Sequence, residues 1–351
     1  MLKKRLICDQ AAVGEKKIWY DIGKLSGAAR MNEKQIEMVS VDQLVPGGHT
    51  YRRLKSLLDF VQIERSVKMQ GSEVGATGFG KDRLTLCLIL QFMEDNSDRE
   101  FERFIAENCA AKWFCGFSLT EKTPDYTTLC KFRNSVGTKQ MADIFGEVKH
   151  QLQARGYCAE VFTFVDSAAL ISKLAMWEER DKAIADGYEK LNNTIMERYA
   201  KDPQMRIGSK GKNKFWFGYK KHVAVDTQSG MITKVAVTKA NVTDADGAKH
   251  VLPKQGALLG DKGYVGAIGE IVGRGLHPMI ILRNNMKQKN RDLDRWITKL
   301  RSPYERTFSK QNKRVRYKGI AKNQGAEFLY ATAYNFRRLL ALDSEGMIMF
   351  A

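Results

Sequence analysis

The chain has 351 residues, 43% of them hydrophobic, which is enough for two or three domains with sizeable cores. Its formal net charge of +18 is unevenly spread, because residues 201–351 hold 29 Lys and Arg against 12 Asp and Glu, a surplus of +17. No stretch reaches the roughly 18 apolar residues of a membrane span, and the six cysteines include no C-x-x-C pair, which argues against a membrane protein, a zinc knuckle and a secreted disulfide framework. We expect a soluble protein of a reducing cytoplasm.

Residues 39–155 have a helical pattern, whereas residues 1–38 show no periodicity and predict no firm structure. The run DRLTLCLILQFMED is almost continuously apolar, which is typical of a buried helix. Ser97, followed three residues later by Glu100, predicts a capping box at the start of the next helix. Residues 39–155 are therefore predicted to form an all-α domain.

The segment TPDYTTLCKFRNSV predicts a third helix in this region, opened by Pro124 and Asp125. Three helices with short connections favour either a helix-turn-helix module whose last helix contacts DNA or a packing domain, and the sequence leaves both open. In the first case Lys131 and Arg133 would contact DNA.

Residues 156–342 predict a mixed α/β domain with a five-stranded sheet and flanking helices. The predicted strands are VFTFVDSAAL, a hairpin of KHVAVD and MITKVAVTKA around the turn TQSG, ALLGDKGY, and HPMIILR. A helical and basic insertion at about 172–218 follows the first strand, and residues 343–351 are a tail.

Three carboxylates lie on these elements. Asp166 directly follows apolar strand residues, where an ionised group is costly unless a metal or a cation compensates it. Asp261 ends a second strand, and Glu305 lies on a predicted helix. Each alone has an ordinary explanation as a turn residue or a solvated helix residue. Together, on separate elements, they favour a divalent metal site with oxygen ligands.

Basic segments accompany these carboxylates and favour a polyanionic partner, most simply nucleic acid, although a solubilising surface is an alternative. RIGSKGKNKFWFGYKKH interleaves cations with aromatic residues, which suits a nucleic-acid backbone track unless Phe215 and Phe217 face the core. The candidate DNA contacts of the second half are Arg206, Lys210, Lys212, Lys214, Lys220 and Lys221 in this segment, and Lys310, Lys313, Arg314, Arg316 and Lys318 after Glu305.

The chain resembles the insertion-sequence transposases of the D-D-E class, specifically the InsH-like branch of the IS-four and IS-five grouping. The resemblance extends from about Val39 to Leu340. Its motifs are LVPGGHTYRRL, NSDREFERFI, KWFCGFSL and TPDYTTLCKFR in the first half, and TFVDSAAL, GYKKHVAVDTQSGMITKVAVTKANVTDADG, LLGDKGY and YERTFSKQNKRVRYKG in the second. It implies a ribonuclease-H-like catalytic domain at residues 156–342.

The resemblance also implies a set of site residues. Asp166, Asp261 and Glu305 would hold two Mg²⁺ ions, for which Mn²⁺ would substitute. Asn241 and Asp244 would support the active-site loop.

Around Glu305 the chain departs in part from the pattern of the wider grouping. Arg301, four residues before Glu305, matches and would contact a phosphate. The positions of a family Tyr and a family Lys hold Thr298 and Asn312, which puts a Tyr-dependent step in doubt.

The activity implied is that of an enzyme that binds the inverted repeats of its own element, cuts a strand with activated water and joins the 3′-hydroxyl to target DNA. Its partners would be double-stranded DNA and further copies of the chain, with no membrane and no organic cofactor, in the bacterial cytoplasm and on the nucleoid when bound to DNA. The alternatives are a ribonuclease-H-like nuclease that does not join strands, and a non-catalytic DNA-binding protein derived from a transposase.

Overall fold

The structure, a computed structural model, describes residues 38–68, 78–173, 176–211, 214–287, 289–310 and 313–346. Within 289–310, the side chains of Pro303 and of residues 305–310 are outside the description. The expectations for residues 1–37, for Lys212 and for the end of the tail therefore concern parts of the chain that lie outside the described residues. Residues Ser40–Ala351 form one compact unit.

The described residues between 41 and 154 are mostly helical. Its helices are α1 (Val41–Leu44), α2 (Thr50–Leu57), α3 (Phe60–Arg65), α4 (Lys81–Met93), α5 (Asp98–Glu107), α6 (Cys109–Cys115) and α7 (Tyr126–Ala154). The predicted capping box is confirmed at the start of α5, where Ser97 Oγ accepts a hydrogen bond from Glu100 N at 3.3 Å and Glu100 Oε2 accepts one from Ser97 N at 2.8 Å. Helix α4 is buried along most of its length, as its apolar run predicted.

Six strands form one mixed sheet. They are β1 (Phe162–Ile171), β2 (Arg206–Lys210), β3 (Lys214–Asp226), β4 (Ile232–Lys239), β5 (Ala257–Gly260) and β6 (His277–Ile280). The main order is β4-β3-β1-β5-β6, with β1 antiparallel to β3 and parallel to β5. The α/β class with a mixed sheet is confirmed. The strand number of five was too low, because the basic segment pairs with itself as the β2–β3 hairpin.

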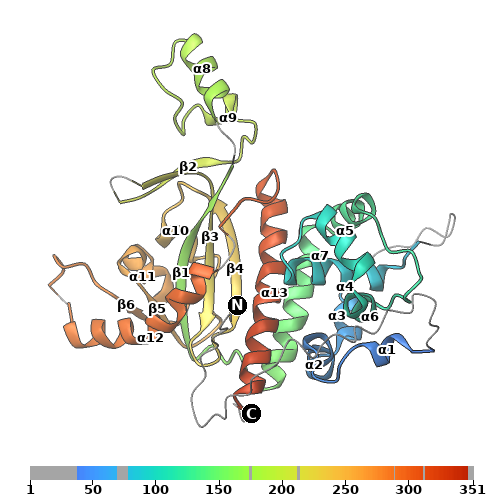
Figure 1. Cartoon of the computed structure of the whole chain (residues 1–351). Helices are drawn as coiled ribbons and strands as arrows, with labels where there is room; N and C mark the ends of the chain where they lie inside the picture. The colour runs from blue at the N-terminus through green and yellow to red at the C-terminus, as the bar shows by residue number, and fades with distance from the viewer. Residues whose placement is uncertain are drawn as a thin grey trace, which may run out of the picture. The chain divides into compact units, whose positions relative to one another are not determined.

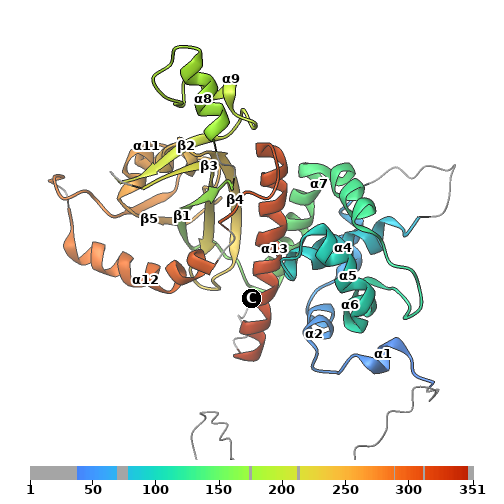
Figure 2. The same ribbon diagram turned by 45° about the horizontal axis from the view of Figure 1, so that its top comes forward.

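Helices cover both faces of the sheet, as Figures 1 and 2 show. The covering helices are α10 (Asp244–Ala248) and α11 (Ile268–Gly273) on one face, and α12 (Arg291–Lys310) and α13 (Ile320–Ser344) on the other. Because neighbouring side chains of a strand point to opposite faces, Val165 packs with α10 and α11 while Phe164 packs with α12 and α13. Asp166 follows Phe164 by two residues and thus belongs to the face that α12 covers.

Helix α13 lies between the sheet and the helices α4 and α7 (Figure 1). It protects the edge of β4, where Gln324 Nε2 donates to Val235 O at 3.1 Å and Asn335 Oδ1 accepts from Ile232 N at 2.8 Å. Phe336 of α13 also belongs to the core of the N-terminal helices. The predicted domain boundary at residue 155 stays a prediction.

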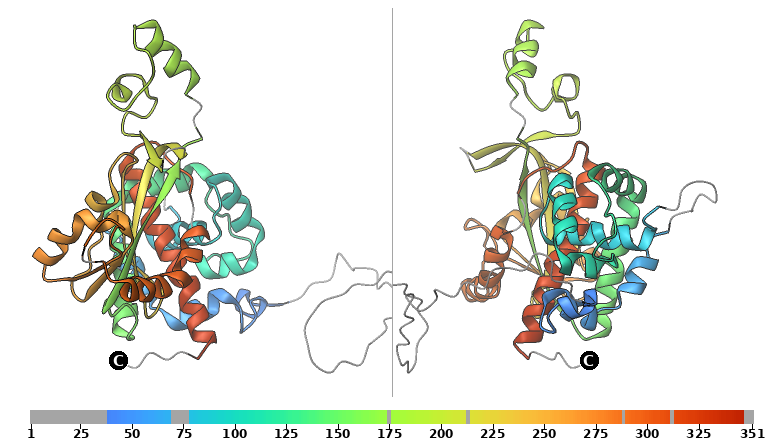
Figure 3. Two further views of the ribbon diagram at one scale, coloured as in Figure 1. Left: turned by 90° about the vertical axis from the view of Figure 1, so that its left-hand side faces the viewer. Right: turned by 45° about the vertical axis from the view of Figure 1, so that its right-hand side comes forward.

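The insertion between β1 and β2 contains α8 (Trp177–Ala185) and α9 (Met196–Tyr199), which project from one end of the sheet in every view (Figure 3). The last third of the predicted insertion belongs to the sheet instead, as β2 and the start of β3. No helix in the described part of the chain combines the length and the apolar character that crossing a bilayer requires.

Candidate active site

Strands β1 and β5 bring two of the predicted carboxylates to the same level of the sheet. Phe164 pairs with Leu259 in the parallel register, and Asp166 and Asp261 each lie two residues further along. Asp261 caps the 3₁₀ helix η2 (Lys262–Ala267), where its Oδ1 accepts a hydrogen bond from Gly263 N at 2.9 Å. The expected adjacency of the two strands is confirmed.

Helix α12 packs on the face of β1 that carries Asp166. Trp296 of α12 contacts Phe162 with ring centroids 5.9 Å apart, and further along both elements the guanidinium carbon of Arg301 lies 5.2 Å from the centroid of the Phe164 ring. Glu305 follows Arg301 by four residues, which is one helical turn in the same direction. Its side chain lies outside the described part of the structure, so its approach to Asp166 stays a prediction.

The charge state of Asp166 reflects its half-buried environment. Burial raises the pKa of this carboxyl, Ser167 N lowers it through a hydrogen bond of 2.8 Å, and the charge of Asp261 raises it again. Arg301 and Lys210 lower it, and the pKa settles at about 6. A carboxylate beside a second carboxylate is a typical arrangement for cation binding.

Asp244, the predicted support residue, is hydrogen-bonded to Ser167, the residue that follows Asp166. Its Oδ1 accepts hydrogen bonds from Ser167 Oγ at 2.8 Å and from Lys220 Nζ at 2.9 Å. Burial raises the pKa of Asp244, but the bonds and charge of Lys220 outweigh that effect and bring the pKa below its usual value. A Cβ on Gly263 would lie 3.0 Å from Asp261 Oδ1 and 3.1 Å from Asp244 Oδ2. Asp244 is thus next to both metal-ligand candidates, whereas Asn241 is exposed.

Tyr264 is a site residue that the sequence did not single out. It is 1% exposed, and burial raises its pKa, with a further rise from the charges of Asp166, Asp244 and Asp261. The hydroxyl of Tyr264 is therefore within electrostatic reach of all three aspartates. The signal available in the sequence was its position three residues after Asp261, in ALLGDKGY.

The donor set fits a hard divalent cation. Carboxylate oxygens are the ligands that Mg²⁺ prefers. A bound cation would also offset the repulsion between the charges of Asp166 and Asp261. Among the described side chains, which exclude that of Glu305, no three acidic, His or Cys residues are close enough to hold a metal ion. Asp244 is consequently better explained as a support than as a third ligand.

Three cationic side chains of the basic segment are paired with partners within the protein. Lys221 is 1% exposed, with its Nζ 3.1 Å from Glu327 Oε2. Lys220 is bonded to Asp244, and Arg206 is buried against backbone carbonyls and Glu197. The expectation that these three contact DNA is revised, because their charges are already compensated by buried or neighbouring partners.

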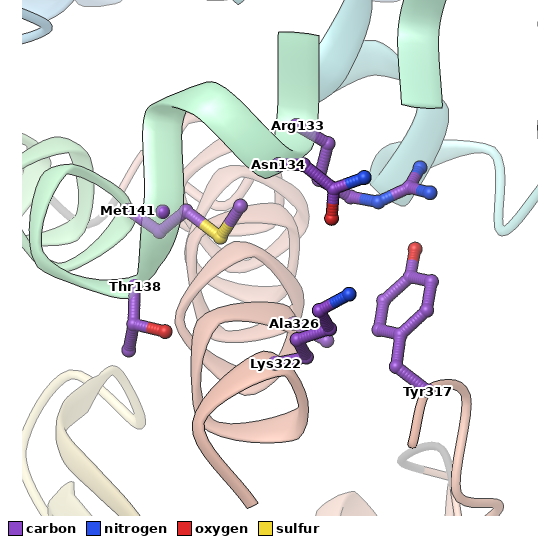
Figure 4. Close-up of a pocket in the computed structure, with 8 residues that line it drawn as sticks. Arg133, Asn134, Thr138, Met141, Tyr317, Lys322 and Ala326 are labelled. Atoms are coloured by element: carbon purple, nitrogen blue, oxygen red, sulfur yellow. The ribbon is translucent and has the colours of Figure 1, made fainter. Parts of the chain in front are cut away.

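Two further candidates, Arg133 and Arg316, have structural partners. Arg133 lines a cavity of about 170 Å³ between α7 and α13, drawn in Figure 4. Arg133 Nη2 bonds Asp98 Oδ2 at 2.8 Å, and its guanidinium carbon lies 4.6 Å from the centre of the Tyr317 ring. Arg316 bonds Tyr330 and the carbonyl of Asn96. The DNA contacts expected of Arg133 and Arg316 are revised for the same reason.

The remaining described candidates are exposed, namely Lys131, Lys210, Lys214, Lys313, Arg314 and Lys318. The side chain of Lys310 is outside the description. Phe215 is 66% exposed beside Lys214, whereas Phe217 packs on a small core with Leu170 and Tyr219. The alternative that both phenylalanines face the core is therefore wrong for Phe215.

Two protein-family models match the chain. A transposase domain (DUF772) matches residues 39–135, and a transposase DDE domain matches residues 194–336, which include Asp261 and Glu305. Asp166 lies outside the second match, so its place in the site rests on the pairing of β1 with β5. No solved structure matches the chain. The DDE domain implies a ribonuclease-H-like fold, in agreement with the mixed sheet and its flanking helices. The two matches together cover more than half of the sequence, and the chain belongs to the insertion-sequence DDE transposases.

Proposed function

We propose that the chain cuts DNA at the ends of its own element in a metal-dependent reaction and joins the released 3′-hydroxyl ends to target DNA. The observation that carries this proposal is the parallel pairing of β1 with β5, which aligns Asp166 and Asp261 at one level of the sheet. The DDE family match supports the same reaction class.

In this proposal Asp166, Asp261 and Glu305 hold two Mg²⁺ ions. Mn²⁺ can substitute for Mg²⁺ at these positions. When bound, the ions supply Lewis acidity for activating water and for stabilising the departing oxygen. The chain's own residues hold the carboxylates in place: Ser167 N donates to Asp166, Gly263 N donates to Asp261, and Asp244 fixes Ser167 through its hydroxyl. We infer that Arg301, whose guanidinium lies over the Phe164 ring, contacts a phosphate beside Asp166.

DNA is proposed to lie against the exposed cations of the second half. Lys210 is close enough for its charge to act on Asp166, and Lys313 and Arg314 join the end of β1 through the pairing of Ile171 with Arg314. These cations would contact phosphates and set the position of the duplex without reading its sequence. We further propose that at least two copies of the chain assemble on paired element ends.

The test uses the full chain, a labelled duplex taken from the DNA that flanks the gene, and a supercoiled target plasmid. We expect Mg²⁺-dependent nicking of the duplex followed by covalent transfer of the label to the plasmid, and neither product in EDTA. Nicking without transfer of the label would instead identify a nuclease that does not join strands. Binding of the duplex without either product would identify a non-catalytic DNA-binding protein.

A further inference from the structure

A basic cleft of about 530 Å³ lies beside the C-terminal end of β1. Its lining comes from three separate segments: the residues that follow β1, the residues that lead into β2, and residues 315–318 after α12. The lining includes Lys173, Lys201, Asp202, Met205, Val315 and Lys318. Lys173 and Lys318 are exposed and come from different segments, so two segments of the lining contribute cations.

The walls of the cleft are fixed by hydrogen bonds. Asp202 Oδ2 accepts from Tyr219 Oη at 2.8 Å and from Gly319 N at 2.8 Å, and the residue is 2% exposed. Gln204 Oε1 accepts from Ile320 N at 2.8 Å. These bonds tie the segment before β2 to the start of α13. Asp202 thus holds the segments of the cleft together.

The chemistry of the mouth favours a polyanion. Lys201 lies 3.4 Å from the exposed Glu178 and 3.7 Å from the buried Glu179, so its charge is already compensated and the available cations are Lys173 and Lys318. Met205 and Val315 form an apolar floor that continues the core around Leu170. Arg316 lines the cleft, but its guanidinium is hydrogen-bonded to Tyr330 and is therefore not counted as a ligand contact. An apolar floor beside exposed cations from two segments suits a sugar–phosphate backbone, because both cations can neutralise phosphates.

The cleft is connected to the active site by one strand. Ile171 N donates to Lys313 O at 2.7 Å, and Val315 N donates to Ile171 O at 3.0 Å, so the wall that carries Lys318 continues directly from the end of β1. Ile171 follows Asp166 by five residues, which is about 17 Å of strand. A duplex that runs along β1 advances about 3.4 Å per nucleotide of one strand, so 17 Å would correspond to about five nucleotides.

From these observations, and on the basis of the proposed function, we propose that Lys173 and Lys318 bind backbone phosphates of the element-end DNA about five nucleotides from the cleaved bond. The cleft would thus set the distance between the held part of the duplex and the carboxylates. It is a positioning site, because none of its residues reaches the reacting atoms.

The first measurement is the salt dependence of DNA binding in EDTA, with a duplex of arbitrary sequence as the probe. Each neutralised phosphate contributes about 0.9 to the slope of log K against log salt, so Lys173→Ala/Lys318→Ala should lower that slope by about 1.8. The matched control, Lys122→Ala/Lys139→Ala, removes two exposed lysines elsewhere and should leave the slope unchanged. An unchanged slope in the cleft variant would overturn the proposal.

The second measurement locates the contact with a pre-cut end duplex from the DNA that flanks the gene, in which single phosphates are replaced by neutral methylphosphonates. Wild-type binding should weaken several-fold at positions about four to six nucleotides from the cut, and the cleft variant should lose this sensitivity at those positions only. Equal sensitivity in both proteins would contradict the proposal.

Thermal unfolding and the oligomeric state complete the test. Both lysines are exposed, so unfolding of the cleft variant should match wild type. A changed oligomeric state with an unchanged salt slope would make the cleft an interface between copies of the chain and overturn DNA binding there. Because neither binding measurement requires cleavage, failure of the proposed chemistry and failure of the proposed cleft give different results.

Discussion

Replacing Lys221 with methionine should weaken folding rather than remove a DNA contact. Lys221 lies on β3, is 1% exposed, and places its Nζ 3.1 Å from Oε2 of the equally buried Glu327 on α13. Removing one partner of a buried ion pair leaves an uncompensated charge in the interior, which costs about 3–5 kcal/mol. We expect Lys221→Met to lower the free energy of unfolding by about that amount.

The size of this loss should depend on pH. Burial raises the pKa of Glu327, and Lys221 opposes the rise through its charge and its hydrogen bond. Without Lys221, the folded-state pKa of Glu327 moves further above its unfolded value. The protonated group then favours the folded state at low pH, and this contribution is lost as the pH rises through the folded-state pKa. Lys221→Met should be closer to wild type at about pH 5 than at about pH 8.

Urea unfolding followed by circular dichroism measures both effects through the midpoint and the slope of the transition. Lys214→Met, an exposed lysine of the same strand, is the matched control and should stay within about 0.5 kcal/mol of wild type. Lys221→Met/Glu327→Met should recover most of the loss, because it leaves no unpaired charge. If Lys221→Met were as stable as wild type and bound DNA more weakly, the reasoning would be refuted. Lys221 would then be a DNA contact.

Three further predictions use the same unfolding assay. Ser97→Ala removes the cap of α5 and should cost about 1 kcal/mol; no loss would show that the capping box is unimportant for stability. Gly247→Ala should cost about 1–3 kcal/mol, because the added Cβ would overlap the buried His222 ring, and a neutral result would show that the ring can move away. Asp166→Asn in EDTA should stabilise the protein at about pH 8 by at most about 3 kcal/mol, because a carboxyl with a raised pKa loses its stabilising contribution as the pH rises through about 6. The same variant should give no such gain at about pH 4, and equal gains at both pH values would contradict a raised pKa.

Much of the architecture was predictable because local signals were strong. The β-branched and aromatic run of VFTFVDSAAL and the alternation in the hairpin around TQSG predicted the central strands, and the capping box marked the start of α5. The adjacency of the strands carrying Asp166 and Asp261 was also expected, because each aspartate directly follows an apolar run. The β2 strand was missed, since its short sequence RIGSK has a single large apolar residue.

The burial and pairing of individual lysines were not predictable from the sequence. Lys220 and Lys221 are neighbours on β3 and point to opposite faces, yet both are buried. Their partners, Asp244 and Glu327, are 24 and 106 residues away in the chain, and only the folded structure brings them together. A basic segment therefore predicts the sign of a surface more reliably than the role of each cation in it.

The central claim is that Asp166, Asp261 and Glu305 together form the catalytic site. The most direct measurement is Mg²⁺-dependent cleavage of a labelled duplex from the DNA that flanks the gene, compared between wild type and the variants Asp166→Asn, Asp261→Asn and Glu305→Gln. Asp292→Asn is the matched control, because Asp292 lies on the same helix as Glu305 with a side chain that is 90% exposed. We expect the three variants to bind the duplex in EDTA as wild type does and to lose cleavage in Mg²⁺, while the control cleaves normally. Cleavage at the wild-type rate by any of the three would contradict the claim.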